Sequence, residues 1–145
     1  MTDDLVTWLR AQIDEDERVA HAVADHRQRR GELRWTQTDP DRTPGLIGDE
    51  CGNVVTYDEG RPNEWQAAHI VRHDPYRVLR QVERDRRILD RHASYDFPYN
   101  PEDGPGEYSW TGRCDYCHDP WPCPDLRDVA APYADRPGYR DEWKP

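Results

Sequence analysis

The first thirty residues carry apolar side chains at the spacing of an amphipathic helix. At 100° per residue, the apolar positions fall within an arc of about 100°. These positions are Leu5, Val6, Leu9, Ile13, Ala20, Val23 and Ala24. Cations at Arg27, Arg29 and Arg30 suit a helix C-terminus, and Gly31 is a natural stop. The pattern therefore predicts a helix over residues 3–29.

Between residues 32 and 60 the pattern changes to short apolar runs separated by Asp, Pro and Gly. Runs of this kind, bounded by turn residues, are typical of short strands. The candidates are 33–36, 45–48 and 53–57, and Cys51-Gly52-Asn53 is expected to form a hairpin turn between the last two. The sequence thus predicts a sheet of two or three short strands.

Helical spacing returns over residues 63–72 and 74–92, with a break at His73-Asp74-Pro75. Proline disfavours helical dihedrals at the residue before it, and Asp74 followed by Pro75 is a strong start signal. One face of the second helix is apolar. The opposite face carries a row of arginines, Arg77, Arg80, Arg84, Arg87 and Arg91. This row is a candidate binding surface, although most such rows are solvated faces with acidic neighbours.

The last third of the chain is rich in Pro and Gly and predicts little regular structure. A linker-like loop at 95–106 precedes a cysteine stretch at 113–124, then a short helix near 125–131 and an irregular tail. Aromatic side chains of that tail, Tyr133, Tyr139 and Trp143, are expected to pack back onto the body.

Taken together, the elements predict an α+β fold. We expect an N-terminal amphipathic helix, a small antiparallel sheet, a broken helix pair and a zinc-stapled, loop-rich C-terminal third. The 145 residues fit one domain, 1–145, divided into segments 1–30, 31–60, 61–93 and 94–145. Only 34% of the residues are hydrophobic, so we expect a small core supported by a staple such as a metal ion.

Charge and hydropathy limit the classes of partner. The net charge of -10 disfavours nucleic-acid binding, which requires clustered cations, and makes a protein the expected partner. No apolar run reaches the ~20 residues that cross a bilayer, and the acidic Met1-Thr2-Asp3-Asp4 does not resemble a signal peptide, so a cytoplasmic location is expected. Clustered cysteines in a reducing compartment are more often ligands or catalytic groups than disulfides.

The cysteines supply the clearest chemical signal. Cys114, Cys117 and Cys123 form the pattern C-x2-C-x5-C, which can present thiolates to a tetrahedral Zn²⁺ ion. A fourth ligand must come from elsewhere, and His92 is favoured because it ends a helix on the margin of the apolar face. Cys51, His118, His69 and His73 are the alternates. Thiolates also suit an iron–sulfur cluster, with Cys51 as the fourth cysteine, but that upstream spacing is too long.

A second histidine pattern leaves an enzymatic alternative open. His69 and His73 are four residues apart on one predicted helical face, as metal-binding pairs often are. The general-base Glu of the H-E-x-x-H motif is missing, and two histidines near a helix end are commonly hydrogen-bonded to neighbours. No residue is assigned a catalytic role.

Several motifs resemble those of a family of small actinobacterial and actinophage proteins described as a domain of unknown function. They are H-I-V-R-H-D-P from residue 69, R-R-I-L-D-R-H from 86, the C-x2-C pair, W-P-C-P from 121 and P-Y-A-D-R-P-G-Y from 132. The resemblance implies an actinobacterial or phage source. It places His92, the C-x2-C pair and Cys123 among recurring family features, and it carries no activity.

From these patterns we expect a zinc-stabilised binding or adaptor protein with a structural rather than catalytic metal. One alternative is a zinc hydrolase that uses His69 and His73 around an open coordination position. Another is an acidic phage-type inhibitor that mimics nucleic acid.

Overall fold

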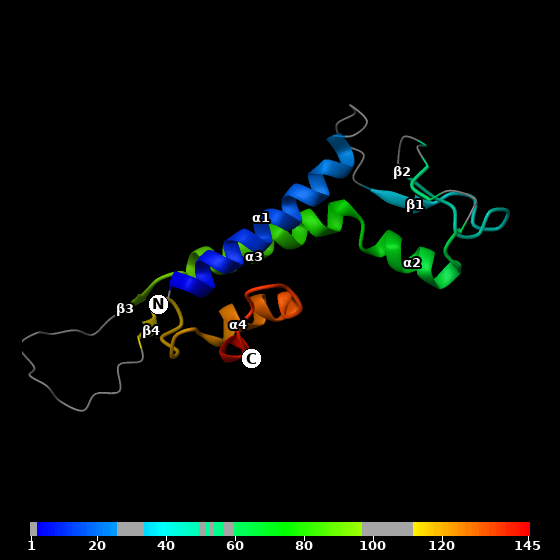
Figure 1. The fold of residues 1–145 in the computed structure, drawn as a ribbon. Coiled ribbons are helices and arrows are strands. Elements are labelled where there is room, and N and C mark those ends of the chain that lie inside the picture. Colours follow the sequence, from blue (N-terminus) through cyan, green and yellow to red (C-terminus); the bar gives the residue numbers. More distant parts are fainter. Residues whose placement is uncertain (1–2, 26–33, 50–51, 53, 57–59, 97–111) are drawn as a thin grey trace, which may run out of the picture. The chain divides into compact units, whose positions relative to one another are not determined.

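The computed structural model describes residues 3–25, 34–49, 52, 54–56, 60–96 and 112–145 (Figure 1). Its first element is helix α1, Asp3–Asp25. The apolar stripe accounts for this helix, because Leu5, Leu9 and Ile13 are all buried. Val19 and Val23 are exposed, so the stripe is covered mainly along the first half of the helix. The predicted extension to residue 29 lies outside the described residues.

A small antiparallel sheet follows. Strand β1, Trp35–Gln37, pairs with β2, Ile47–Asp49, in the register Thr36 opposite Gly48. The expected third strand over 53–57 is wrong for its described residues, because Val54 makes only a single bridge to Gly48. The backbone N–H of Ile47 in β2 donates its hydrogen bond to the side-chain hydroxyl of Thr56, at 3.0 Å, instead of to a backbone carbonyl of a third strand.

The predicted helix pair is observed as α2, Glu64–Arg72, and α3, Pro75–His92. Asn63 caps α2 through a capping box with Gln66, which satisfies two backbone donors at once. Asp74 caps α3, because its carboxylate accepts a hydrogen bond of 2.8 Å from the Arg77 amide and another of 3.3 Å from the Trp35 amide. The same carboxylate therefore joins the start of α3 to β1.

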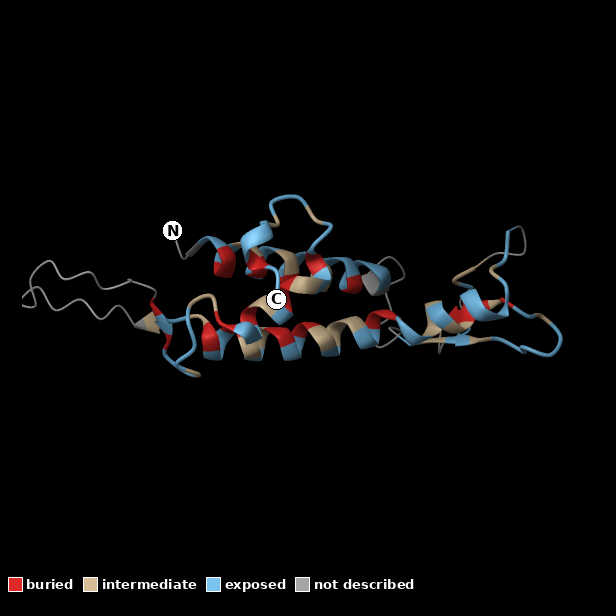
Figure 2. Ribbon diagram, turned by 90° about the horizontal axis from the view of Figure 1, so that it is seen from below, coloured by how far each residue is buried: buried red, intermediate tan, exposed pale blue. Residues whose placement is uncertain are grey.

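Helix α3 is amphipathic, with one buried face and one exposed face. Its buried positions include Val82, Asp85, Leu89 and His92, which recur at intervals of three and four residues along one side of the helix (Figure 2). The five arginines of the predicted row are all exposed. Arg84 reaches Asp85 at 2.6 Å. The arrangement fits a solvated face, and a binding role for the arginine row stays a prediction.

The C-terminal part has more regular structure than the sequence predicted. Two-residue strands β3, Tyr95–Asp96, and β4, Arg113–Cys114, pair antiparallel where only a loop was expected. Helix α4, Pro124–Ala130, starts and ends one residue before the predicted span and continues into a 3-10 turn, Ala131–Tyr133. A further 3-10 turn, Asp141–Trp143, was not foreseen.

The tail packs through an aromatic cluster centred on Trp8 of α1. The Trp8 ring lies 5.2 Å from that of Trp143, 5.7 Å from Tyr139 and 6.4 Å from Tyr133, measured between ring centroids. Edge-on and tilted contacts at these distances are favourable for aromatic pairs. The expectation that these tail residues pack onto the body is therefore confirmed.

Contacts within the chain group into two compact units, residues 1–13 with 84–145 and residues 14–83. The first contains Cys114, Cys117, Cys123, α4 and the aromatic cluster; the second contains β1, β2 and α2. The α+β class is confirmed, with four α-helices and short antiparallel strand pairs among the described residues. That the chain acts as a single domain stays a prediction.

Candidate metal centre

The pairing of β3 with β4 positions the first cysteine beside the end of α3. Tyr95 follows His92 by three residues and lies opposite Cys114 in the register of the two strands. Nearby, the Asp115 amide donates a hydrogen bond of 3.1 Å to the Ser94 carbonyl. A chain segment more than twenty residues later in the sequence is thereby returned to His92.

A tight turn presents the second cysteine. The His118 amide donates to the Cys114 carbonyl at 2.9 Å, and the Cys114 amide donates to the Asp119 carbonyl at 2.9 Å. His118 itself has a φ of 61°, the left-handed region that L-residues seldom occupy, and the Arg113 guanidinium holds its carbonyl oxygen at 2.9 Å. The turn closes on Cys114 and Cys117 and leaves the His118 side chain exposed.

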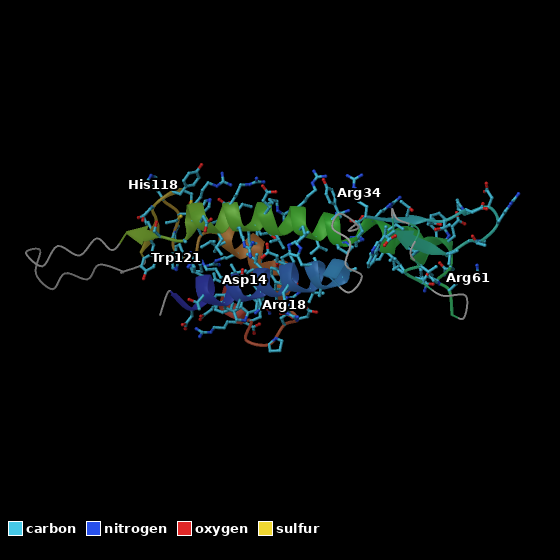
Figure 3. All side chains as sticks on the ribbon, turned by 90° about the horizontal axis from the view of Figure 1, so that it is seen from above. Asp14, Arg18, Arg34, Arg61, His118 and Trp121 are labelled. Atoms are coloured by element: carbon cyan, nitrogen blue, oxygen red, sulfur yellow. The ribbon has the colours of Figure 1, made fainter. Side chains whose placement is uncertain are left out.

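The third cysteine is the N-cap residue of α4. The chain reaches it through a cis peptide bond between Trp121 and Pro122, and Pro124 occupies the first turn of the helix. Trp121 packs against Tyr95 of β3 with ring centroids 4.9 Å apart. Figure 3 marks His118 and Trp121 on this segment between β4 and α4. One short helix start thus fixes the position of Cys123.

These elements bring His92, Cys114, Cys117 and Cys123 together, with one ligand atom of each lying within 4.8 Å of all the others. The Nδ1 atom of His92 lies 3.4 Å from the sulfur of Cys114 and 3.4 Å from that of Cys123. A tetrahedral Zn²⁺ with bonds of about 2.3 Å to sulfur and 2.0 Å to nitrogen separates S and N by about 3.5 Å. The cluster therefore has the donor set and close to the spacing of such a site.

The surroundings of the cluster disfavour free thiolates. Cys114 and Cys123 are fully buried, and His92 is 3% exposed. Burial raises the pKa of the Cys123 thiol to about 12, and burial likewise raises the pKa of Cys117. A cation bound between the sulfurs reverses this effect, since it compensates the charge of the thiolates. The three cysteines form no disulfide.

Two neighbours of His92 were not singled out from the sequence. The exposed ring of Tyr116 meets the imidazole edge-on at 4.8 Å between centroids. An Asp125 carboxylate oxygen lies 3.3 Å from Nε2, the nitrogen that faces away from the thiols. The only sequence signal for Asp125 is its place two residues after a predicted ligand, which does not show that it faces His92.

The alternate ligands are placed as follows. His118 is exposed and outside the cluster, and Cys51 lies outside the described residues. The rings of His69 and His73 are 4.3 Å apart between centroids, and Nδ1 of His73 contacts the His69 carbonyl at 2.9 Å. Within the described part of the chain, neither histidine belongs to a group with the geometry to hold a metal.

The fold and the cluster define a small α+β protein with a Cys3His group that could hold a metal ion. The chain belongs to a family of unknown function, DUF6221, whose model matches residues 2–145. No curated protein and no solved structure gives a significant match. None of the described helices combines the length and the apolar character that a membrane span requires. The actinobacterial or phage source stays a prediction.

Proposed function

We propose that this protein is a zinc-stabilised binding or adaptor protein whose metal supports folding rather than catalysis. The observation that carries the proposal is the convergence of four protein side chains, three thiols and one imidazole, at a largely buried point. A structural zinc site is closed by four protein ligands, whereas a catalytic site keeps a position for water or substrate. The donor count supports the structural role.

The donor set also favours zinc over other metals. Thiolate sulfur suits Zn²⁺ and iron–sulfur clusters, while Mg²⁺ and Ca²⁺ take oxygen ligands. Most iron–sulfur clusters are held by four cysteines, and this group offers three with a histidine. Cys3His is a common ligand set of structural zinc.

The cluster joins three elements that lie far apart in the sequence. His92 ends α3, Cys114 lies in β4, and Cys123 starts α4. The strand pair that supports them is two residues long, and such a short pairing has little stability of its own. A metal ion at this point contributes its binding free energy to folding of the C-terminal part.

An exposed tryptophan on α2 supports the proposed role in binding a partner. Trp65 is 80% exposed, and tryptophan is enriched among the residues that dominate protein interfaces. It lines a shallow groove of about 660 Å³ together with Pro62, His69 and Ile70. A protein surface is the class of partner that such an exposed aromatic side chain suits.

Metal removal tests the structural role. After a chelator has removed the metal, as verified by elemental analysis, the melting temperature should fall and the backbone amides of residues 112–145 should exchange faster with solvent, and readdition of Zn²⁺ should restore both. Cys117→Ser should weaken zinc binding, whereas His118→Asn, a change to a residue that tolerates the left-handed region at the neighbouring exposed position, should not. Unchanged thermal stability after verified metal loss would rule the proposal out.

A further inference from the structure

The two ring nitrogens of His92 face different partners. Nδ1 lies 3.4 Å from the sulfurs of Cys114 and Cys123, and Nε2 lies 3.3 Å from a carboxylate oxygen of Asp125. A neutral imidazole carries its proton on one nitrogen and a lone pair on the other. A proton on Nε2 satisfies the carboxylate and leaves the Nδ1 lone pair directed toward the thiol cluster.

We propose that Asp125 is a positioning residue of the metal centre, which accepts the Nε2 proton of His92 and thereby makes Nδ1 the ligand atom. This inference rests on the proposed zinc site. Histidine ligands commonly donate their second N–H to a carboxylate, which fixes the tautomer and the ring orientation and raises the basicity of the ligand nitrogen. Asp125 has the required chemistry and distance.

Local structure explains why Asp125 reaches the ring. Cys123 is the N-cap residue of α4, and Asp125 lies in the first turn of the same helix. One helix start therefore delivers both a sulfur ligand and the carboxylate that orients the nitrogen ligand. The Asp125 side chain is 56% exposed, so its charge stays in contact with water while one oxygen meets the buried ring.

Tyr116 and Arg91 complete the outer side of this arrangement. The Tyr116 ring covers the edge of His92, and the Arg91 guanidinium lies 5.6 Å from the centre of the Tyr116 ring. Asp125 and Asp128 line the same groove of about 420 Å³ beside the histidine. Asp128 is likewise exposed on α4, but it is Asp125 whose carboxylate oxygen contacts Nε2. Replacement of Asp128 is therefore a matched control, because it removes the same charge from the same helix without removing a contact to His92.

The test compares zinc affinity in the full chain by competition with a chromophoric chelator. Asp125→Ala should weaken binding about 10- to 100-fold, the usual effect of removing such an outer carboxylate. Asp125→Asn keeps an acceptor oxygen without the charge, so its zinc affinity should fall less than that of Asp125→Ala. The asparagine variant also provides a measurement if the alanine variant folds poorly. Asp128→Ala should stay within about twofold of the unsubstituted chain, because its carboxylate is not paired with the ring.

An NMR measurement distinguishes loss of the Asp125–His92 contact from a general disturbance of helix α4. In the zinc-loaded protein, the Nε2 proton of His92 should give a slowly exchanging, downfield resonance that Asp128→Ala keeps and Asp125→Ala loses. If the resonance persists in Asp125→Ala, or if that variant binds zinc within about twofold of the unsubstituted chain, the role of Asp125 is wrong. If the unsubstituted chain binds no zinc, the proposed function itself fails, so the two failures are distinguishable.

Discussion

The indole Nε1 of Trp8 donates a hydrogen bond of 3.0 Å to the carbonyl oxygen of Pro137, 129 residues further along the chain. Rings of Tyr133, Tyr139 and Trp143 surround the same indole. The first helix therefore provides the surface on which the C-terminal tail is ordered.

Replacement of Trp8 and replacement of Trp65 should have very unequal effects on stability. Trp8→Ala removes the centre of the aromatic cluster and should lower the free energy of unfolding by about 3 kcal/mol, since large-to-small changes in packed sites leave cavities. Trp65→Ala should change it by less than about 0.5 kcal/mol, because the side chain is 80% exposed. Urea denaturation of the two variants checks this. Comparable losses in both would contradict the packing described for Trp8.

Gly138 is predicted to be intolerant of any side chain. Its φ is +88°, and a Cβ atom there meets Nε1 of Trp8 at 2.8 Å. Gly138→Ala should therefore destabilise the protein through both backbone strain and the clash, by about 2 kcal/mol or more. Gly60→Ala is the matched control, because its φ is +81° with no atom within 4 Å of the added Cβ. Equal destabilisation by the two substitutions, measured by denaturant midpoint, would show that the clash is relieved.

Because its thiols are buried, the metal-free protein should become less stable as the pH rises in the alkaline range. Burial raises the pKa of Cys123 to about 12, above the ordinary value of 9.0, so the folded state keeps a proton that the unfolded chain releases. The stability from this difference is fully present below about pH 9 and is lost progressively as the pH rises toward about 12. With zinc bound, the thiols are already deprotonated and this loss should disappear.

Free energies of unfolding measured at about pH 8 and about pH 10 test the sign of this effect. Cys123→Ser serves as the control, because serine does not titrate in this range. The metal-free unsubstituted chain should lose more stability between the two pH values than metal-free Cys123→Ser does. An equal loss would assign the alkaline effect to other groups.

Local sequence signals were sufficient for the helices and for most of the cysteine cluster. Asn63 and the Asp74-Pro75 pair act through contacts within a few residues, so α2 and α3 were predictable close to their observed bounds. His92 was identifiable as a candidate ligand because it combines a helix end with a position beside the apolar face. Its convergence with the three cysteines is observed, and its bond to a metal stays a prediction.

Other features depend on tertiary structure and left no sequence signal. The strands β3 and β4 contain two residues each, too few to show an alternating pattern. The composition of residues 53–57 is typical of a strand. In the structure, however, Val54 forms a single bridge to Gly48 and no strand. Asp125 reaches His92 only because α4 starts beside the end of α3, a relation that spacing along the chain does not encode.

X-ray absorption spectroscopy at the zinc edge of the purified protein tests directly whether His92, Cys114, Cys117 and Cys123 form a closed zinc site. We expect one Zn²⁺ per chain with three sulfur neighbours at about 2.3 Å and one nitrogen neighbour at about 2.0 Å. In Cys117→Ser one sulfur neighbour should be lost, and in His118→Asn the first shell should be unchanged. A first shell with two or fewer sulfurs, with water in an open position, or a protein that takes up no zinc would contradict this expectation.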